Sequence, residues 1–84
     1  MRIAICDDLT ECRLSVKCYA GEYFKLRHIE CSIDEFETGT DLLKSDEIYD
    51  ILFLDIELGD TNGIAVAKQI QQKQIWKLKF VQNA

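Results

Sequence analysis

The segment DILFLDIELGD, residues 50–60, decides the fold. Its run ILFL, residues 51–54, is apolar at every position, which is typical of a strand buried on both faces. The run ends at Asp55. A carboxylate directly after a buried strand does nothing for packing, so the segment predicts a core strand that delivers an acid to a functional site.

A second apolar run has the same form. RIAIC, residues 2–6, lacks polar alternation and ends at Asp7 and Asp8. We therefore expect two central parallel strands whose ends carry acids. By contrast, Ile29, Cys31 and Ile33 alternate with polar residues, which indicates a strand at a sheet edge with one face in water.

Helices are predicted between these strands. Apolar residues at spacings of three and four indicate a first helix, with this set on its buried face: Leu9, Cys12, Val16, Tyr19, Tyr23 and Leu26. Residues 38–41 (TGTD) fit a capping box that opens a short second helix. A third helix is expected to begin at Asn62, with Ile64, Ala67 and Ile70 facing inward.

The C-terminal segment predicts a fourth strand. Trp76, Leu78 and Phe80 alternate with Lys77 and Lys79, and the lysines are typical of an edge strand. The expected fold is one α/β domain over residues 1–84, an open, doubly wound parallel sheet of (βα)3β form with strand order 2-1-3-4. The apolar side chains expected to be exposed on the last strand favour a closed two-fold homodimer, for which exchange of the C-terminal segment is one route.

Composition and charge argue against some classes of function. The 84 residues carry a net charge of −5, with all 15 acids in residues 1–60 and four lysines in residues 61–84. No basic stripe with interleaved aromatics predicts nucleic-acid contact, and no apolar run is long enough for a membrane span, so a cytoplasmic protein is expected. The four cysteines form no CxxC pair and are expected to be reduced thiols, and the single His28 falls at a helix-to-strand turn.

The strand-end acids point to a metal. Ligands of open α/β sheets bind beyond the carboxyl ends of the strands, where Asp7, Asp8 and Asp55 should converge. Carboxylates that close repel one another unless a cation is shared between them. Mg²⁺ is bound by one or two carboxylates and retains positions for phosphate oxygens. A carboxylate at such a site can also attack phosphorus and form an acyl phosphate.

Three stretches resemble the receiver domain of bacterial two-component response regulators: IAICDD (3–8), FLDIEL (53–58) and NGIAVAKQI (62–70). The residues of the first two stretches most resemble those of the LytTR-type subfamily. The resemblance implies that Asp55 is the phosphoacceptor, that Asp7 and Asp8 hold Mg²⁺, and that the backbone carbonyl of Glu57 is a further ligand. It also implies a sensor histidine kinase as phosphodonor, and a self-phosphorylating signalling domain rather than a turnover enzyme.

The sequence departs from that family at three places. The loop after the phosphoacceptor reads Leu58-Gly59-Asp60, where the family has a proline. The family's hydroxyl residue at the end of strand four falls at Gln82 or Asn83. The family's strand-five lysine and the DNA-binding domain of LytTR proteins have no counterpart here, so the resemblance implies a receiver truncated after its fourth strand.

Other hypotheses remain open from the sequence. A haloacid-dehalogenase-type phosphotransferase also places a nucleophilic Asp after an apolar strand, but needs a second Asp where this chain has Glu57. A truncated receiver that no longer signals would act only as an interaction module. Asp8 followed by Glu11 could be simply the cap of the first helix.

Overall fold

The structure, a computed structural model, describes residues 1–55, 64–66, 68–69 and 79–83 of the chain. Its elements are β1 (Arg2–Cys6), α1 (Thr10–Leu26), β2 (Ser32–Phe36), α2 (Gly39–Lys44), β3 (Ile51–Asp55) and β4 (Lys79–Asn83). The strands form one parallel sheet in the order β2-β1-β3-β4. This confirms the predicted architecture and strand order, with β2 at an edge and β1 between β2 and β3.

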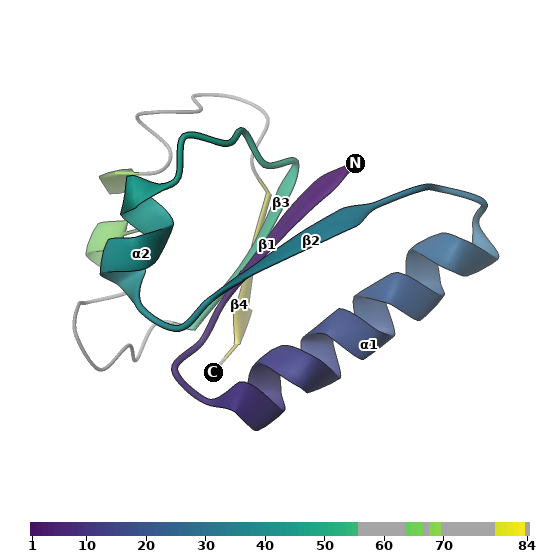
Figure 1. The fold of residues 1–84 in the computed structure, drawn as a ribbon, viewed down its shortest axis with the longest axis horizontal. Coiled ribbons are helices and arrows are strands. Elements are labelled where there is room, and N and C mark those ends of the chain that lie inside the picture. Colours follow the sequence, from purple (N-terminus) through teal and green to yellow (C-terminus); the bar gives the residue numbers. More distant parts are fainter. Residues whose placement is uncertain (56–63, 67, 70–78, 84) are drawn as a thin grey trace.

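Helices lie on both faces of the sheet (Figure 1). One face carries α2 together with the helical residues 64–66 and 68–69, and the other carries α1. The run ILFL explains this arrangement, because successive side chains of a strand point to opposite faces. Leu52 and Leu54 therefore belong to the α2 side, and Ile51 and Phe53 to the α1 side.

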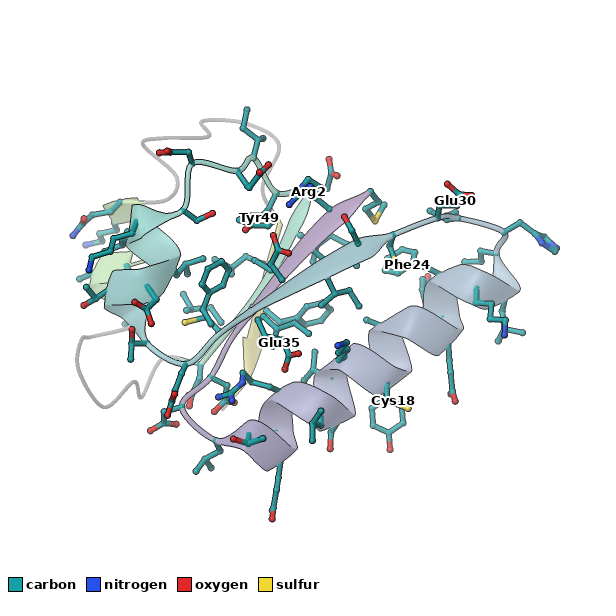
Figure 2. The ribbon with its side chains drawn as sticks, in the orientation of Figure 1. Arg2, Cys18, Phe24, Glu30, Glu35 and Tyr49 are labelled. Carbon is teal, nitrogen blue, oxygen red and sulfur yellow. The ribbon has the colours of Figure 1, made fainter. Side chains whose placement is uncertain are left out.

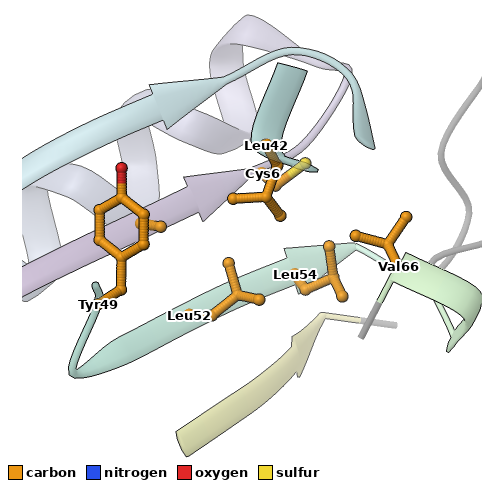
Figure 3. Close-up of a cluster of buried hydrophobic side chains, with 7 residues drawn as sticks. Cys6, Leu42, Tyr49, Leu52, Leu54 and Val66 are labelled. Atoms are coloured by element: carbon orange, nitrogen blue, oxygen red, sulfur yellow. The ribbon is translucent and has the colours of Figure 1, made fainter. Parts of the chain in front are cut away.

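The α2 face contains the larger buried cluster (Figure 3). Its buried members are Ala4, Cys6, Leu42, Tyr49, Leu52, Leu54 and Val66. Leu42 is supplied by α2 and Val66 by the helical residues 64–66, so both helical segments pack on the same strands. Val66 is almost fully buried, whereas Ile64, predicted to face inward, is 53% exposed. The prediction that Ile64 faces inward was therefore wrong. The other two residues predicted to face inward, Ala67 and Ile70, lie outside the described residues.

Among the described residues, the α1 face has the smaller buried cluster. Ile3 and Ile5 of β1 pack there with Phe24 of α1, and Ala20 is the other buried residue of the helix. Val16 is partly buried against this cluster.

The predicted buried face of α1 was only partly right. Cys12 and Val16 are half-buried, but Leu9, Tyr19, Tyr23 and Leu26 are each more than half exposed. The helix turns the stripe of Val16, Ala20 and Phe24 to the strands, because four-residue steps keep side chains on one helical face. The tyrosines consequently lie beside that contact rather than in it.

Helix starts and turns follow local chemistry. Thr38 caps α2, with its hydroxyl oxygen accepting from the Asp41 N–H at 3.1 Å, which confirms the predicted helix start at this residue. Asp8 does not cap α1, because the helix begins at Thr10 with Leu9 in the cap position. His28 lies in the turn after α1, as predicted, with a φ of 56°.

A network around Arg2, made with Asp34, Glu47 and Tyr49, joins β1 and β2 to the segment before β3 (Figure 2). The Arg2 Nη2 atom lies 2.9 Å from Asp34 Oδ2, and its Nε atom 3.5 Å from Glu47 Oε2. The buried Tyr49 donates its hydroxyl hydrogen to Asp34 Oδ2 at 2.8 Å. This network fixes the chain that leads into β3.

Two further findings bear on the protein's surroundings. Within the described ranges, no helix combines the length and apolar character that crossing a membrane requires. The four cysteines are free thiols: Cys6 is buried, Cys12 and Cys31 are half-buried, and Cys18 is exposed.

Candidate functional site

Three acids predicted from the sequence meet at the carboxyl end of the sheet. Asp7 and Asp8 follow β1, and Asp55 ends β3, the strand paired with β1. One carboxylate oxygen from each lies within 4.8 Å of the other two. The two strands bring them together because parallel neighbours end at the same edge of the sheet.

The three carboxylates differ in exposure. Asp7 is buried, with 6% of its surface exposed, whereas Asp55 is half-buried and Asp8 is exposed. Exposure to solvent therefore increases from Asp7 through Asp55 to Asp8. A ligand that enters from water reaches Asp8 and Asp55 while Asp7 supports it from below.

Asp7 is held in place through its backbone and its side chain. Its N–H donates to the carbonyl of Phe36 at 3.1 Å, and its Oδ1 accepts from the Leu9 N–H at 3.0 Å. The Arg13 Nη1 atom donates to the Asp7 carbonyl at 2.7 Å. Sequence reasoning missed Arg13; its place in the first turns of a helix that starts beside Asp7 was the available signal.

Burial raises the pKa of the Asp7 carboxyl above its usual range, and the negative charges of Asp55 and Asp8 raise it further. The hydrogen bond from Leu9 acts in the opposite direction. A buried carboxylate beside two others is a costly arrangement for the isolated chain. The cost is removed when a cation is shared between the three groups.

The donor set fits a hard divalent cation. Carboxylate oxygens are the ligands that Mg²⁺ prefers, and it is bound through few of them so that water or phosphate oxygens complete its shell. Asp7, Asp8 and Asp55 would hold it. Glu57, whose backbone carbonyl was predicted as a further ligand, lies outside the described residues.

The end of β4 adds one position to this edge. The strand register places Asn83 opposite Asp55 and Gln82 opposite Leu54. Of the two residues considered for the end of strand four, Asn83 is therefore the one in register with Asp55.

Several solved structures similar to this chain are response regulators. The chain matches the response regulator TrrA of Thermotoga maritima, solved in complex with Mg²⁺ and BeF, at 31% identity and a TM-score of 0.78, over 94% of this chain and 64% of that one. TrrA in complex with the histidine kinase ThkA matches at 30% identity and a TM-score of 0.77, over 96% of this chain and 66% of that one.

A CheY-like receiver domain from Methanospirillum hungatei matches at 21% identity and a TM-score of 0.72, over 96% of this chain and 62% of that one. No protein-family model and no curated protein matches the sequence. The chain thus has the fold of a response-regulator receiver domain, and it spans about two thirds of the length of these neighbours.

Proposed function

We propose that this chain accepts a phosphoryl group on Asp55, with Mg²⁺, from a sensor histidine kinase. The observation that carries the proposal is the meeting of three carboxylates within 4.8 Å at the carboxyl ends of β1 and β3. The neighbours support it, since TrrA was solved both with Mg²⁺ and BeF and with a histidine kinase.

Asp55 is the best nucleophile of the three acids. The side chain of Asp7 is buried and accepts a backbone hydrogen bond, which suits it to a supporting role. Asp8 is exposed in the connection before α1. Asp55 is fixed by the strand ladder of β3 and is half-buried, so its carboxylate is both oriented and reachable.

In the proposed reaction an Asp55 carboxylate oxygen forms a bond to phosphorus as the P–N bond of the donor's phosphohistidine breaks. The electron pair leaves with the imidazole nitrogen, which then takes a proton from water. The product is an acyl phosphate on Asp55. When bound, Mg²⁺ would offset negative charge on the transferring group.

The finer identity is also a proposal. The stretches IAICDD and LDIEL favour a LytTR-type transcriptional regulator as the parent protein, with its DNA-binding domain outside the sequence and a cytoplasmic location. The chain would act as a phosphoaccepting signalling domain rather than a turnover enzyme, without touching nucleic acid itself. The homodimer predicted through the C-terminal segment stays a prediction.

Intact mass tests the proposal directly. The chain is incubated with phosphoramidate, whose P–N bond resembles that of phosphohistidine, with Mg²⁺ or with a chelator. We expect one added phosphoryl group, lost in Asp55→Asn and in chelator, and released by hydroxylamine as an acyl phosphate should be. Asp46→Asn, which changes an exposed acid before β3, is the matched control and should be modified like the native chain.

Two results would contradict the proposal. A mass gain that survives in Asp55→Asn would place the phosphoryl group elsewhere, and one undiminished in chelator would exclude the metal. A native chain that takes up no phosphoryl group would favour the interaction-module hypothesis in its place.

A further inference from the structure

Arg13 of α1 contacts the backbone that carries two of the three acids. Its Nη1 atom donates to the Asp7 carbonyl oxygen at 2.7 Å, and its Nη2 atom donates to Thr10 Oγ1 at 3.1 Å. The side chain of Arg13 is only 13% exposed. The guanidinium therefore lies in the corner between the end of β1 and the start of α1, where the surrounding chain restricts its direction.

The Asp7 carbonyl belongs to the peptide group that joins Asp7 to Asp8. A peptide group is planar, so a bond to its oxygen restricts the direction of the chain at both residues. On its other side, Asp7 donates its N–H to the Phe36 carbonyl at 3.1 Å. The peptide groups before and after Asp7 are thus both held by hydrogen bonds, and the second of these bonds depends on the Arg13 side chain.

Arg13 is itself anchored to β2. Its Nε atom lies 3.6 Å from Glu35 Oε1, and the other carboxylate oxygen of Glu35 lies 3.3 Å from Lys17 Nζ. Glu35 directly precedes Phe36, which accepts the Asp7 N–H. The contacts form a closed ring through Asp7, Phe36, Glu35 and Arg13. Because the guanidinium is a rigid planar fork, it can hold both the carbonyl and the carboxylate at once.

We propose that Arg13 is a positioning residue for the Mg²⁺ site, and that it raises the affinity for the cation by holding the peptide group between Asp7 and Asp8. The inference rests on the metal site of the proposed function and adds a residue that acts through the backbone rather than as a ligand. The charge of Arg13 is paired with Glu35, so the carboxylates of the site stay available to the cation.

The positions of the acids before the cation binds explain why such a residue matters. Without a cation the three carboxylates repel one another, so a loose connection after β1 would let them move apart. In the structure one oxygen of each lies within 4.8 Å of the other two. A site that is already assembled loses less freedom when its ligand binds, and therefore binds it more tightly.

A Mg²⁺ titration followed by two-dimensional NMR measures this effect without phosphoryl transfer. The Leu9 amide is a suitable signal, because it donates to Asp7 Oδ1. Arg13→Ala should raise the dissociation constant for Mg²⁺ about tenfold, as is typical when a partner that orients metal ligands is removed. Lys17→Ala is the matched control, since it removes the other cation paired with Glu35 and should change the constant by about twofold at most.

A double variant separates positioning from a general loss of structure. If Arg13 acts through Asp7, adding Arg13→Ala to Asp7→Asn should weaken Mg²⁺ binding by less than about threefold. A full tenfold loss in that background would overturn the proposal. The same spectra show whether each variant is folded. Should Arg13→Ala not fold, Arg13→Lys takes its place; it keeps the charge but lacks the planar fork, so a several-fold loss is expected.

The results also distinguish this inference from the proposed function. Equal Mg²⁺ affinities for the native chain and Arg13→Ala would overturn the inference and leave the function standing, as would an equal loss in Lys17→Ala. A native chain whose Mg²⁺ binding depends on Arg13, but which takes up no phosphoryl group, would support the inference and contradict the function. A native chain that binds no Mg²⁺ would contradict both.

Discussion

At the amino end of β1, acidic side chains form ion pairs with Arg2. At the carboxyl end of the same strand, three acids lie close to one another. Arg2 contacts Asp34 at 2.9 Å and Glu47 at 3.5 Å, while Asp7, Asp8 and Asp55 gather within 4.8 Å. The first arrangement stabilises the fold by itself. The second would stabilise it only with a cation from outside, and this is the contrast on which the proposed function depends.

The comparison predicts opposite signs for removing a carboxylate at the two ends. Asp34→Ala should lower the free energy of unfolding by about 2 kcal/mol, because the buried Tyr49 hydroxyl loses a charged acceptor. The ion pair with Arg2 adds little, since both side chains are about 40% exposed. Urea unfolding measures the loss.

Asp46→Ala is the control for that measurement. Asp46 is exposed and lies near the same network in sequence. Its substitution should change the free energy of unfolding by no more than about 0.5 kcal/mol. Equal losses in the two variants would show that the Arg2 network is not a particular source of stability.

A second test of the comparison uses alkaline pH. Burial raises the pKa of the Tyr49 phenol above its ordinary value of 10.0, and the charge of Asp34 raises it further. Above pH 10 the unfolded chain releases this proton while the folded chain keeps it, so stability is complete below that pH and is lost as pH rises. For one group the slope is at most about 1.4 kcal/mol per pH unit.

Tyr49→Phe should remove that slope from the alkaline limb of the stability curve. Tyr19→Phe, which removes a phenol that is 74% exposed, is the control and should leave it. An unchanged limb in Tyr49→Phe would mean that the folded chain does not raise the pKa of Tyr49 in solution.

At the carboxyl end the effect should be smaller and reversed. Asp55→Asn removes one of three repelling charges, so it should raise the stability of the metal-free chain by about 1 kcal/mol. In the native chain Mg²⁺ at ten times its dissociation constant should add about 1.4 kcal/mol, a gain that the variant should largely lose. Thermal unfolding with Mg²⁺ and with chelator measures both; a native midpoint indifferent to Mg²⁺ would contradict a shared site.

The sequence predicted the sheet because its strands differ in burial. Apolar runs at 2–6 and 51–54 and an alternating run at β2 were enough to place β1 centrally and β2 at an edge. The site followed from the same runs, since the acids directly after them had to meet at one edge. Each of these local patterns is compatible with one arrangement of the strands and of the acids that follow them.

The helices were predicted less well, because a helix face depends on what covers it. Tyr19 and Tyr23 have the spacing of a buried stripe but line an open groove, and Ala20 and Phe24 make the close contact with the strands. Ile64 was likewise predicted to be buried, but it is exposed and Val66 is buried instead. Arg13 was missed because hydrophobic periodicity does not report a side-chain bond to the backbone six residues earlier; only its place near the start of the helix indicated it.

The smallest expected effect is a change in the reactivity of the Cys12 thiol, which depends on the charge of the neighbouring acids. Burial raises the pKa of Cys12, and the charges of Asp7 and Asp55 raise it further. Mg²⁺ bound by these acids would offset their charge and lower that pKa, so more thiolate would form at pH 8. Alkylation of Cys12 by iodoacetamide should then become about twofold faster, because the thiolate is the nucleophile.

Cys18 supplies an internal control for this measurement. It is exposed on the side of α1 away from the sheet (Figure 2), so Mg²⁺ should leave its alkylation rate unchanged. Peptide mapping by mass spectrometry follows both thiols in one sample at constant ionic strength. Acceleration of Cys12 alone, lost in Asp55→Asn, would place the cation among the acids at the carboxyl end. Equal rates for both thiols with and without Mg²⁺ would show that no cation offsets those charges, and the contrast between the two ends of the sheet would lose its functional meaning.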